Sequence, residues 1–273
     1  MRRFCVCSVA LLACGALVSA RAAESAAERG KRVVNEALQA LGGDAFLNMR
    51  DRIETGRAYS FYRLELSAIA VAKIYTRYAP APVPGKLAVR EREAFFSRAS
   101  AREEVEAVLF TEEAAWALTY RGALPLEDQR YENFQDATRR NIFYILRERL
   151  NEPGLDFYWM GSDVVDNREV EIVDISDAAR DSVTVYFSRS DKLPLRQSFK
   201  RRNPQFKDFD TEASVFDKYH DVGGGVKWPL NIRRERNGEK IFEMYSDSVE
   251  INQGLTDDLF TVPANMKILP KPK

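Results

Sequence analysis

Cysteine and histidine are scarce in this chain. Its 273 residues include three cysteines, Cys5, Cys7 and Cys14, and a single histidine, His220. Zinc sites and nucleophilic catalysis need several such side chains at defined spacings, and no such spacing occurs. We expect His220, which precedes a turn at Asp221, to be a surface residue at a strand end. We predict no catalytic residue, no metal and no cofactor.

An excess of charge of one sign is also lacking, because 41 basic residues balance 41 acidic ones. A nucleic-acid partner would require a basic face, so we predict no nucleic-acid binding. Acidic runs such as Glu91-Arg92-Glu93 could serve a hydrolase only if two carboxylates faced each other across a cleft. Charge runs are usually solvated faces, so an envelope hydrolase is the least favoured function.

The amino-terminal segment has the three parts of a secretory signal peptide. Met1-Arg2-Arg3 is cationic, an apolar run extends from Phe4 to about Val18, and small residues follow up to Ala23. The apolar run is shorter than the ~20 residues of a permanent membrane helix. We predict cleavage after Ala22, so that residues 1–22 are the signal and residues 23–273 form a single periplasmic domain.

The segment Leu11-Leu12-Ala13-Cys14-Gly15 offers an alternative, because it resembles a bacterial lipobox that would anchor the protein through a lipid on Cys14. Leu12 stands where a smaller residue is usual, and this favours ordinary cleavage. The mature domain then contains no cysteine, so disulfides and thiol chemistry are excluded. Removing three of the 41 basic residues (Arg2, Arg3 and Arg21) leaves 38 against 41 acidic ones, a net charge of about −3.

The mature chain begins with a helical pattern and then changes to the pattern of strands. A helix is predicted from Glu24 to Leu41, ended by Gly42-Gly43, after which Asp44 to Leu47 lead into the first strand. Asn237-Gly238 is the strongest hairpin signal, and Asp166-Asn167 is a second. Strands are predicted near 52–63, 69–78, 87–96, 104–111, 114–121, 157–165, 168–175, 181–188, 194–201, 212–220, 226–236 and 239–251.

Short turns make consecutive strands antiparallel, and a sheet of about ten or more strands tends to curl or close. The predicted fold class is therefore α+β: a curved antiparallel sheet forms an incomplete β-barrel. The N-terminal helix and an inserted helix, Asn133 to about Leu150, should cover its concave side or mouth. The tail from Pro263 is expected to be frayed.

Aromatic residues recur in the predicted strands, and most of them must belong to the core. A concave sheet could also leave some of them around an apolar ligand pocket. Strand alternation gives the following candidate ligand-binding residues: Tyr59, Phe61, Tyr75, Phe95, Trp116, Tyr120, Ile142, Leu146, Tyr186, Phe199 and Trp228.

Several short sequence segments of the mature chain resemble those of the LolA/LolB-like outer-membrane lipoprotein-sorting proteins. They are Ala40-Leu41-Gly42-Gly43, Asp51 to Gly56, Lys192 to Arg196, Tyr219 with Asp221-Val222, Trp228-Pro229, Arg236 to Lys240 and Leu255 to Phe260. The resemblance implies an incomplete barrel whose cavity holds acyl chains, with Asn133 to Leu150 as a lid. The family's key arginine maps to no position here, so a divergent member is expected.

The resulting expectation is an exported, non-enzymatic carrier, monomeric, with lipid or lipoprotein acyl chains as partners and transient contacts with envelope proteins. The alternative is an envelope structural or interaction protein whose concavity is packed shut by its own side chains. A pocket of at least ~300 Å³ would separate the two.

Overall fold

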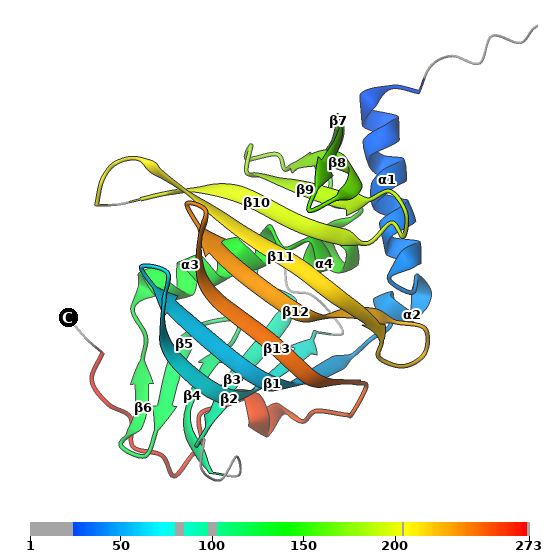
Figure 1. Cartoon of the computed structure of the whole chain (residues 1–273). Helices are drawn as coiled ribbons and strands as arrows, with labels where there is room; N and C mark the ends of the chain where they lie inside the picture. Colours follow the sequence, from blue (N-terminus) through cyan, green and yellow to red (C-terminus); the bar gives the residue numbers. More distant parts are fainter. Residues whose placement is uncertain (1–23, 80–84, 98–102, 204, 272–273) are drawn as a thin grey trace, which may run out of the picture.

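The computed structural model describes residues 24–79, 85–97, 103–203 and 205–271 (Figure 1). The predicted signal, including Cys14, lies outside the described residues. The helices are α1 (Ala26–Ala40), α2 (Asp44–Leu47), α3 (Asp128–Arg139), α4 (Ile142–Tyr144), the π-helical turn η1 (Ile145–Arg149) and the 3₁₀ turn η2 (Asp257–Phe260). No helix in these described ranges is both long and apolar enough to cross a membrane.

Thirteen strands form one antiparallel sheet in the order β6-β5-β4-β3-β2-β1-β13-β12-β11-β10-β9-β8-β7. The sheet curves without closing, as predicted, and β6 and β7 are its edges. The strands are β1 (Asp51–Tyr62), β2 (Glu65–Tyr78), β3 (Val89–Phe96), β4 (Glu104–Phe110), β5 (Ala115–Thr119), β6 (Gly122–Pro125), β7 (Asp156–Val165), β8 (Arg168–Ser176), β9 (Ser182–Ser188), β10 (Pro194–Arg202), β11 (Phe209–Asp221), β12 (Lys227–Arg236) and β13 (Glu239–Ile251). Only the pairing of β1 with β13 joins strands that are distant in sequence.

Helix α1 begins with a capping box, because the Ser25 hydroxyl accepts from the Glu28 amide while the Glu28 carboxylate accepts from the Ser25 amide. Its buried face, which includes Val33 and Val34, packs on β7 and β8. Gly30 permits a close approach, since a Cβ there would lie 2.7 Å from the carbonyl oxygen of Phe157. Figure 1 shows α1 standing along this end of the sheet.

The main hydrophobic core fills part of the concavity. It joins α1 and α2 to α4, η1, strands β7 to β13 and the ends of β2 and β3. Ile142, Ile145 and Leu146 are completely buried there, so α4 and η1 act as a plug. Helix α3 is different, because none of its residues is buried.

The structure corrects three sequence expectations. The inserted helix begins at Asp128 and breaks near Asn141, whose side chain accepts from the Phe143 amide at 2.9 Å. The Asp44–Leu47 segment is a short helix instead of a lead into the strand. The described part of the tail, from Pro263 to Lys271, is held against edge strand β6, since the Ala123 amide donates to the Lys267 carbonyl and the Leu269 amide donates to the Ala123 carbonyl.

The β12–β13 turn follows its sequence signal, and the β1–β2 turn does not. Asn237 and Gly238 both have positive φ, as the hairpin signal predicts. His220 is exposed at the end of β11, also as predicted. The β1–β2 turn consists of Arg63 and Leu64, which also have positive φ (50° and 65°) although neither is glycine or asparagine.

Candidate functional site: a cavity under helix α3

A cavity of about 380 Å³ lies in the half of the concavity that the plug leaves free. Strands β1 to β4 form one wall, β10 to β13 form the other, and α3 and α4 cover it. Figure 1 shows α3 and α4 within the curve of the sheet, behind β11 and β12. The volume lies within the ~300–1,000 Å³ that is usual for small-ligand sites.

A buried ion pair forms the base of the cavity. The Arg52 Nε donates to Glu54 Oε1 at 2.8 Å, and the two side chains are 7% and 3% exposed. The other Arg52 nitrogens donate to Tyr78 Oη at 2.9 Å and to Thr76 Oγ1 at 3.0 Å. The guanidinium carbon lies 3.8 Å from the ring centroid of Trp228. These contacts satisfy a charge that would otherwise be costly to bury.

Glu91 and Glu93 project from β3 into the same cavity. The sheet register aligns Glu91 with Thr76 and Arg52, and Glu93 with Ile74 and Glu54. Neither carboxylate makes a hydrogen bond or ion pair with another described residue. Burial, together with the neighbouring charge of Glu93, raises the pKa of Glu91 to about 7, against the opposing effect of Arg234 and Arg52.

Apolar side chains provide most of the remaining surface. Phe143 from α4 packs against Trp228, with centroids 4.6 Å apart, and against Phe216 at 4.9 Å. Ile232 and Met244 continue this surface along β12 and β13. The indole Nε1 of Trp228 is buried and has no hydrogen-bond partner among the described residues. The cavity therefore combines an aromatic surface with many polar and charged groups.

Helix α3 is held over the cavity by contacts at its two sides. Phe134 stacks on Phe110 of β4 with centroids 3.9 Å apart, and the Tyr131 hydroxyl donates to the Thr111 carbonyl at 2.9 Å. On the opposite wall, the Arg201 guanidinium donates to the Asn133 carbonyl at 3.2 Å and contacts Asp136 at 3.3 Å. None of its residues is buried, and a helix held by such peripheral contacts is the kind of element that opens locally.

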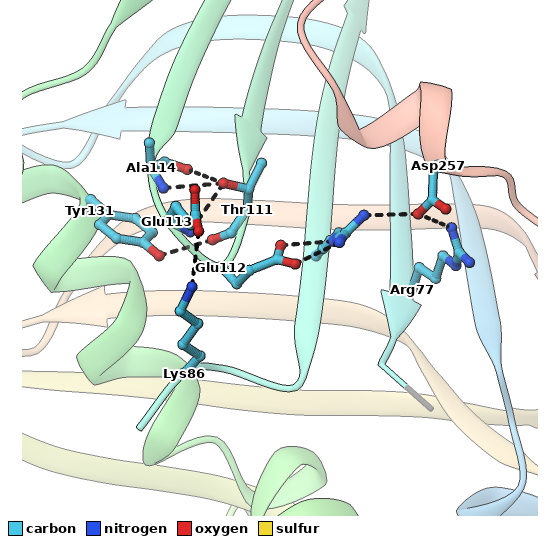
Figure 2. Close-up of polar contacts among 9 residues, drawn as sticks. Arg77, Lys86, Thr111, Glu112, Glu113, Ala114, Tyr131 and Asp257 are labelled. Atoms are coloured by element: carbon cyan, nitrogen blue, oxygen red, sulfur yellow. Dashed lines mark hydrogen bonds and ion pairs between the residues drawn. The ribbon is translucent and has the colours of Figure 1, made fainter. Parts of the chain in front are cut away.

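The β4–β5 turn that receives Tyr131 is itself braced (Figure 2). The Thr111 hydroxyl donates to the Ala114 carbonyl at 3.0 Å, and Lys86 pairs with Glu113 at 2.9 Å. Figure 2 also shows Asp257 of η2 reaching Arg77, at 2.6 Å. The turn that anchors α3 is therefore held by contacts of its own.

Only two of the candidate ligand-binding residues line the cavity, Phe199 and Trp228. Ile142 and Leu146 lie in the plug. Phe95 packs with the clusters that contain Met244 and Phe110. Five of the remaining six lie elsewhere: Tyr75 and Trp116 pack with Val262 and Met266 near the carboxyl terminus, Tyr59 contacts the Tyr245 ring, Phe61 lies under Lys240, and Tyr120 is 87% exposed.

Tyr186 alternates with the core residues Val185 and Phe187, so its side chain belongs to the opposite face of β9. Because nearly every strand carries aromatics, residue type alone does not identify the concave face.

Sequence reasoning missed the charged members of the site. The expectation that Glu91-Arg92-Glu93 is a solvated face is wrong for both glutamates, which line the cavity. The spacing of Arg52 with Glu54, and of Glu91 with Glu93, already put each pair on one face of its strand. Which face is concave depends on the curvature of the sheet.

Among the described residues, no group of three or more histidine, cysteine, aspartate or glutamate side chains is placed to hold a metal ion. The carboxylates of Glu91 and Glu93 extend from one wall, side by side. Glu212 on the other wall is paired with Arg236 at 2.9 Å. A glycosidase pair flanks the scissile bond, and the free carboxylates do not form such a pair.

Comparison with known proteins gives structural matches only. No protein-family model matches the sequence, and no curated protein matches it significantly. An outer membrane lipoprotein-sorting protein domain from Vibrio parahaemolyticus is 13% identical, with 86% of this chain and 97% of that chain covered and a TM-score of 0.58. A DUF1329 family protein from Desulfovibrio piger is 12% identical, with 85% and 97% covered and a TM-score of 0.50.

A LolA superfamily protein from Nitrosomonas europaea is 11% identical, with 85% of this chain and 97% of that chain covered and a TM-score of 0.48. At these identities, the shared property is the fold. The open antiparallel barrel, the leading helix and the inserted helices agree with the predicted resemblance. The chain thus has the fold of an outer membrane lipoprotein-sorting protein domain.

Proposed function

We propose that this protein is an exported carrier that shelters an apolar or amphiphilic ligand, such as an acyl chain, in the cavity under α3. The observation that supports it most is the cavity of about 380 Å³ between two walls of one curved sheet. Phe143, Phe216 and Trp228 offer an apolar surface there, and α3 is a cover that can open. The lipoprotein-sorting fold supports the same proposal.

The proposal keeps residues 1–22 as a cleaved export signal, residues 23–273 as one periplasmic domain and the protein as a monomer without enzymatic activity. A concavity packed shut would instead support a structural role. Here the plug fills only half of the concavity, and the remaining volume exceeds the ~300 Å³ needed for a small ligand. Carrier function is therefore better supported than the structural alternative.

The test combines native mass spectrometry of the protein purified from its own envelope with uptake of a fluorescent fatty acid. We expect a co-purifying lipid and saturable uptake. Ala137 of α3 lines the cavity, whereas Gln129 of the same helix is exposed and does not. Ala137→Trp should fill the cavity and abolish uptake, and Gln129→Trp should retain it.

Thermal melting of both variants verifies that they fold. Absence of any bound lipid together with absence of uptake by the wild-type protein would refute the carrier proposal. Uptake that Ala137→Trp leaves unchanged would place the ligand outside this cavity.

A further inference from the structure

Five of the twelve large apolar side chains that are exposed among the described residues lie on two turns beside the cavity. Tyr62, Leu64 and Leu66 lie at the tip of the β1–β2 hairpin and are 66%, 67% and 51% exposed. Phe206 and Phe209 lie at the β10–β11 turn and are 77% and 59% exposed. Such side chains on prominent turns contribute nothing to the core, and exposed apolar groups of this size mark interaction sites.

The backbone conformation of the β1–β2 tip is also energetically unfavourable. A two-residue hairpin turn with positive φ at both positions favours Asn-Gly, yet Arg63 and Leu64 occupy it here. Left-handed backbone at a residue with a side chain is energetically unfavourable. The same chain uses Asn237-Gly238 at the β12–β13 turn, so the β1–β2 turn keeps a leucine at its tip at a cost in stability. Strain of this kind suggests a functional requirement.

These turns form one continuous rim. The β12–β13 turn lies between the two apolar tips in the sheet order. The Asn237 amide donates to the Thr211 carbonyl at 2.8 Å, and its side chain donates to Asp210 at 2.8 Å. On the other side, the Lys240 ammonium lies 4.1 Å from the ring centroid of Phe61. Figure 1 shows the three turns together at upper left.

The rim borders the entrance of the cavity. Arg234, Arg236 and Phe242, at the ends of β12 and β13 that meet in this rim, line the cavity. Residues 62–66, 200–212 and 234–240 hold eight basic and six acidic side chains. This small basic excess contrasts with the acidic balance expected of the mature chain.

We infer that this rim, tipped by Tyr62, Leu64, Leu66, Phe206 and Phe209, docks the cavity entrance onto the surface of a phospholipid bilayer. The inference rests on the proposed carrier function, since it gives an apolar ligand a path between membrane and cavity that avoids water. The tips project separately, and a deformable lipid interface accommodates them without the matching hollows that a folded partner would require. Aromatic, leucine and arginine side chains together suit the interfacial region of a bilayer, and the basic excess favours anionic head groups.

The experiment uses the mature protein and vesicles of phosphatidylethanolamine and phosphatidylglycerol at a ratio of 3:1, with sedimentation as the readout. The test variant is Leu64→Ser/Leu66→Ser/Phe206→Ser. The control, Tyr158→Ser/Met160→Ser/Val164→Ser, removes three exposed apolar side chains from edge strand β7. The test variant should bind vesicles roughly tenfold or more weakly, and the control should bind as the wild-type protein does.

A second readout separates this inference from the carrier proposal. The test variant should take up a fluorescent fatty acid delivered in solution as the wild-type protein does. Transfer of the fatty acid from vesicles to the test variant should slow by the same factor by which vesicle binding weakens. If the test variant binds vesicles as tightly as the wild-type protein does, the docking surface is refuted and the carrier proposal still stands. A second outcome would also overturn the docking surface. In it, neither protein binds vesicles, and the wild-type protein self-associates in light scattering whereas the test variant does not. Loss of uptake in both assays by the wild-type protein would refute the carrier itself.

Discussion

The guanidinium carbon of Arg52 lies over the indole of Trp228, 3.8 Å from the ring centroid, while the guanidinium nitrogens donate to Glu54, Thr76 and Tyr78. Arg52 comes from β1 and Trp228 from β12, so this contact ties the two walls of the cavity together beneath its apolar lining. A buried charge thus stabilises the structure and shapes the site at once.

Replacement of Arg52 by methionine should destabilise the protein by about 3–5 kcal/mol, because Glu54 would remain buried without its partner. The double variant Arg52→Met/Glu54→Met should recover much of that loss, since it removes both charges. Chemical denaturation measures both values. Arg32→Met, which removes an exposed pair with Glu36, should change the free energy of unfolding by no more than about 1 kcal/mol. Equal losses in the Arg52 and Arg32 variants would contradict this account.

Glu91 should make stability depend on pH. Its pKa is raised to about 7 in the folded protein, so the folded state holds a proton that the unfolded state releases near pH 4.5. Between these values, the contribution of Glu91 to the free energy of unfolding falls as pH rises. Glu93, Glu54, Arg52 and Arg234 supply the charges around it.

Glu91→Gln removes this dependence. The free energy of unfolding of the variant, relative to the wild-type protein, should therefore increase by on the order of 1 kcal/mol or more between pH 5 and pH 8. Glu250→Gln, at an exposed position of β13, serves as the control. A difference that stays constant with pH would show that Glu91 titrates as an ordinary carboxyl.

Ligand binding should follow the same titration. Protonated Glu91 removes one negative charge from the cavity wall, whereas ionised Glu91 beside Glu93 makes the wall more strongly acidic. We expect a neutral apolar fluorophore to bind less tightly at pH 8 than at pH 6, and the Glu91→Gln variant to lose most of this dependence. Fluorescence titration at the two pH values measures the affinities, and unchanged affinity in the wild-type protein would argue against Glu91 facing the ligand.

The anchors of α3 should control ligand exchange. Tyr131→Phe removes the hydrogen bond to Thr111, and Phe134→Ala removes the ring stacked on Phe110. The double variant should exchange bound fluorophore several-fold faster in stopped-flow experiments, because α3 opens at a lower free-energy cost. Tyr158→Phe, at an exposed tyrosine of β7, should leave the rate unchanged.

Close packing of α1 on β7 should depend on Gly30. A methyl group there would lie 2.7 Å from the Phe157 carbonyl oxygen, so Gly30→Ala must displace the helix although alanine favours helix formation. We expect destabilisation of about 1–3 kcal/mol by chemical denaturation. Ala27→Gly, at an exposed position of the same helix, should cost about 1 kcal/mol through helix propensity alone. Stabilisation by Gly30→Ala would contradict the observed packing.

Local sequence patterns determined most of the helices and strands of this protein. Alternating residues and turn dipeptides such as Asn237-Gly238 place strands and hairpins, since these signals depend only on neighbouring backbone geometry. A long run of antiparallel strands also implies a curved sheet with helices against it. The capping box at Ser25 and Glu28 likewise requires no distant contact.

The tertiary structure decided what faces the concavity. Alternation places Glu91 and Glu93 on one side of β3, but only the curvature of the whole sheet makes that side the interior. The break near Asn141 is likewise non-local, because the Ile142 amide at this break donates to the Gln197 side chain of β10 at 2.8 Å. The sequence alone thus determined an open antiparallel barrel, whereas long-range packing decided which half is filled and which charged residues line the half that remains.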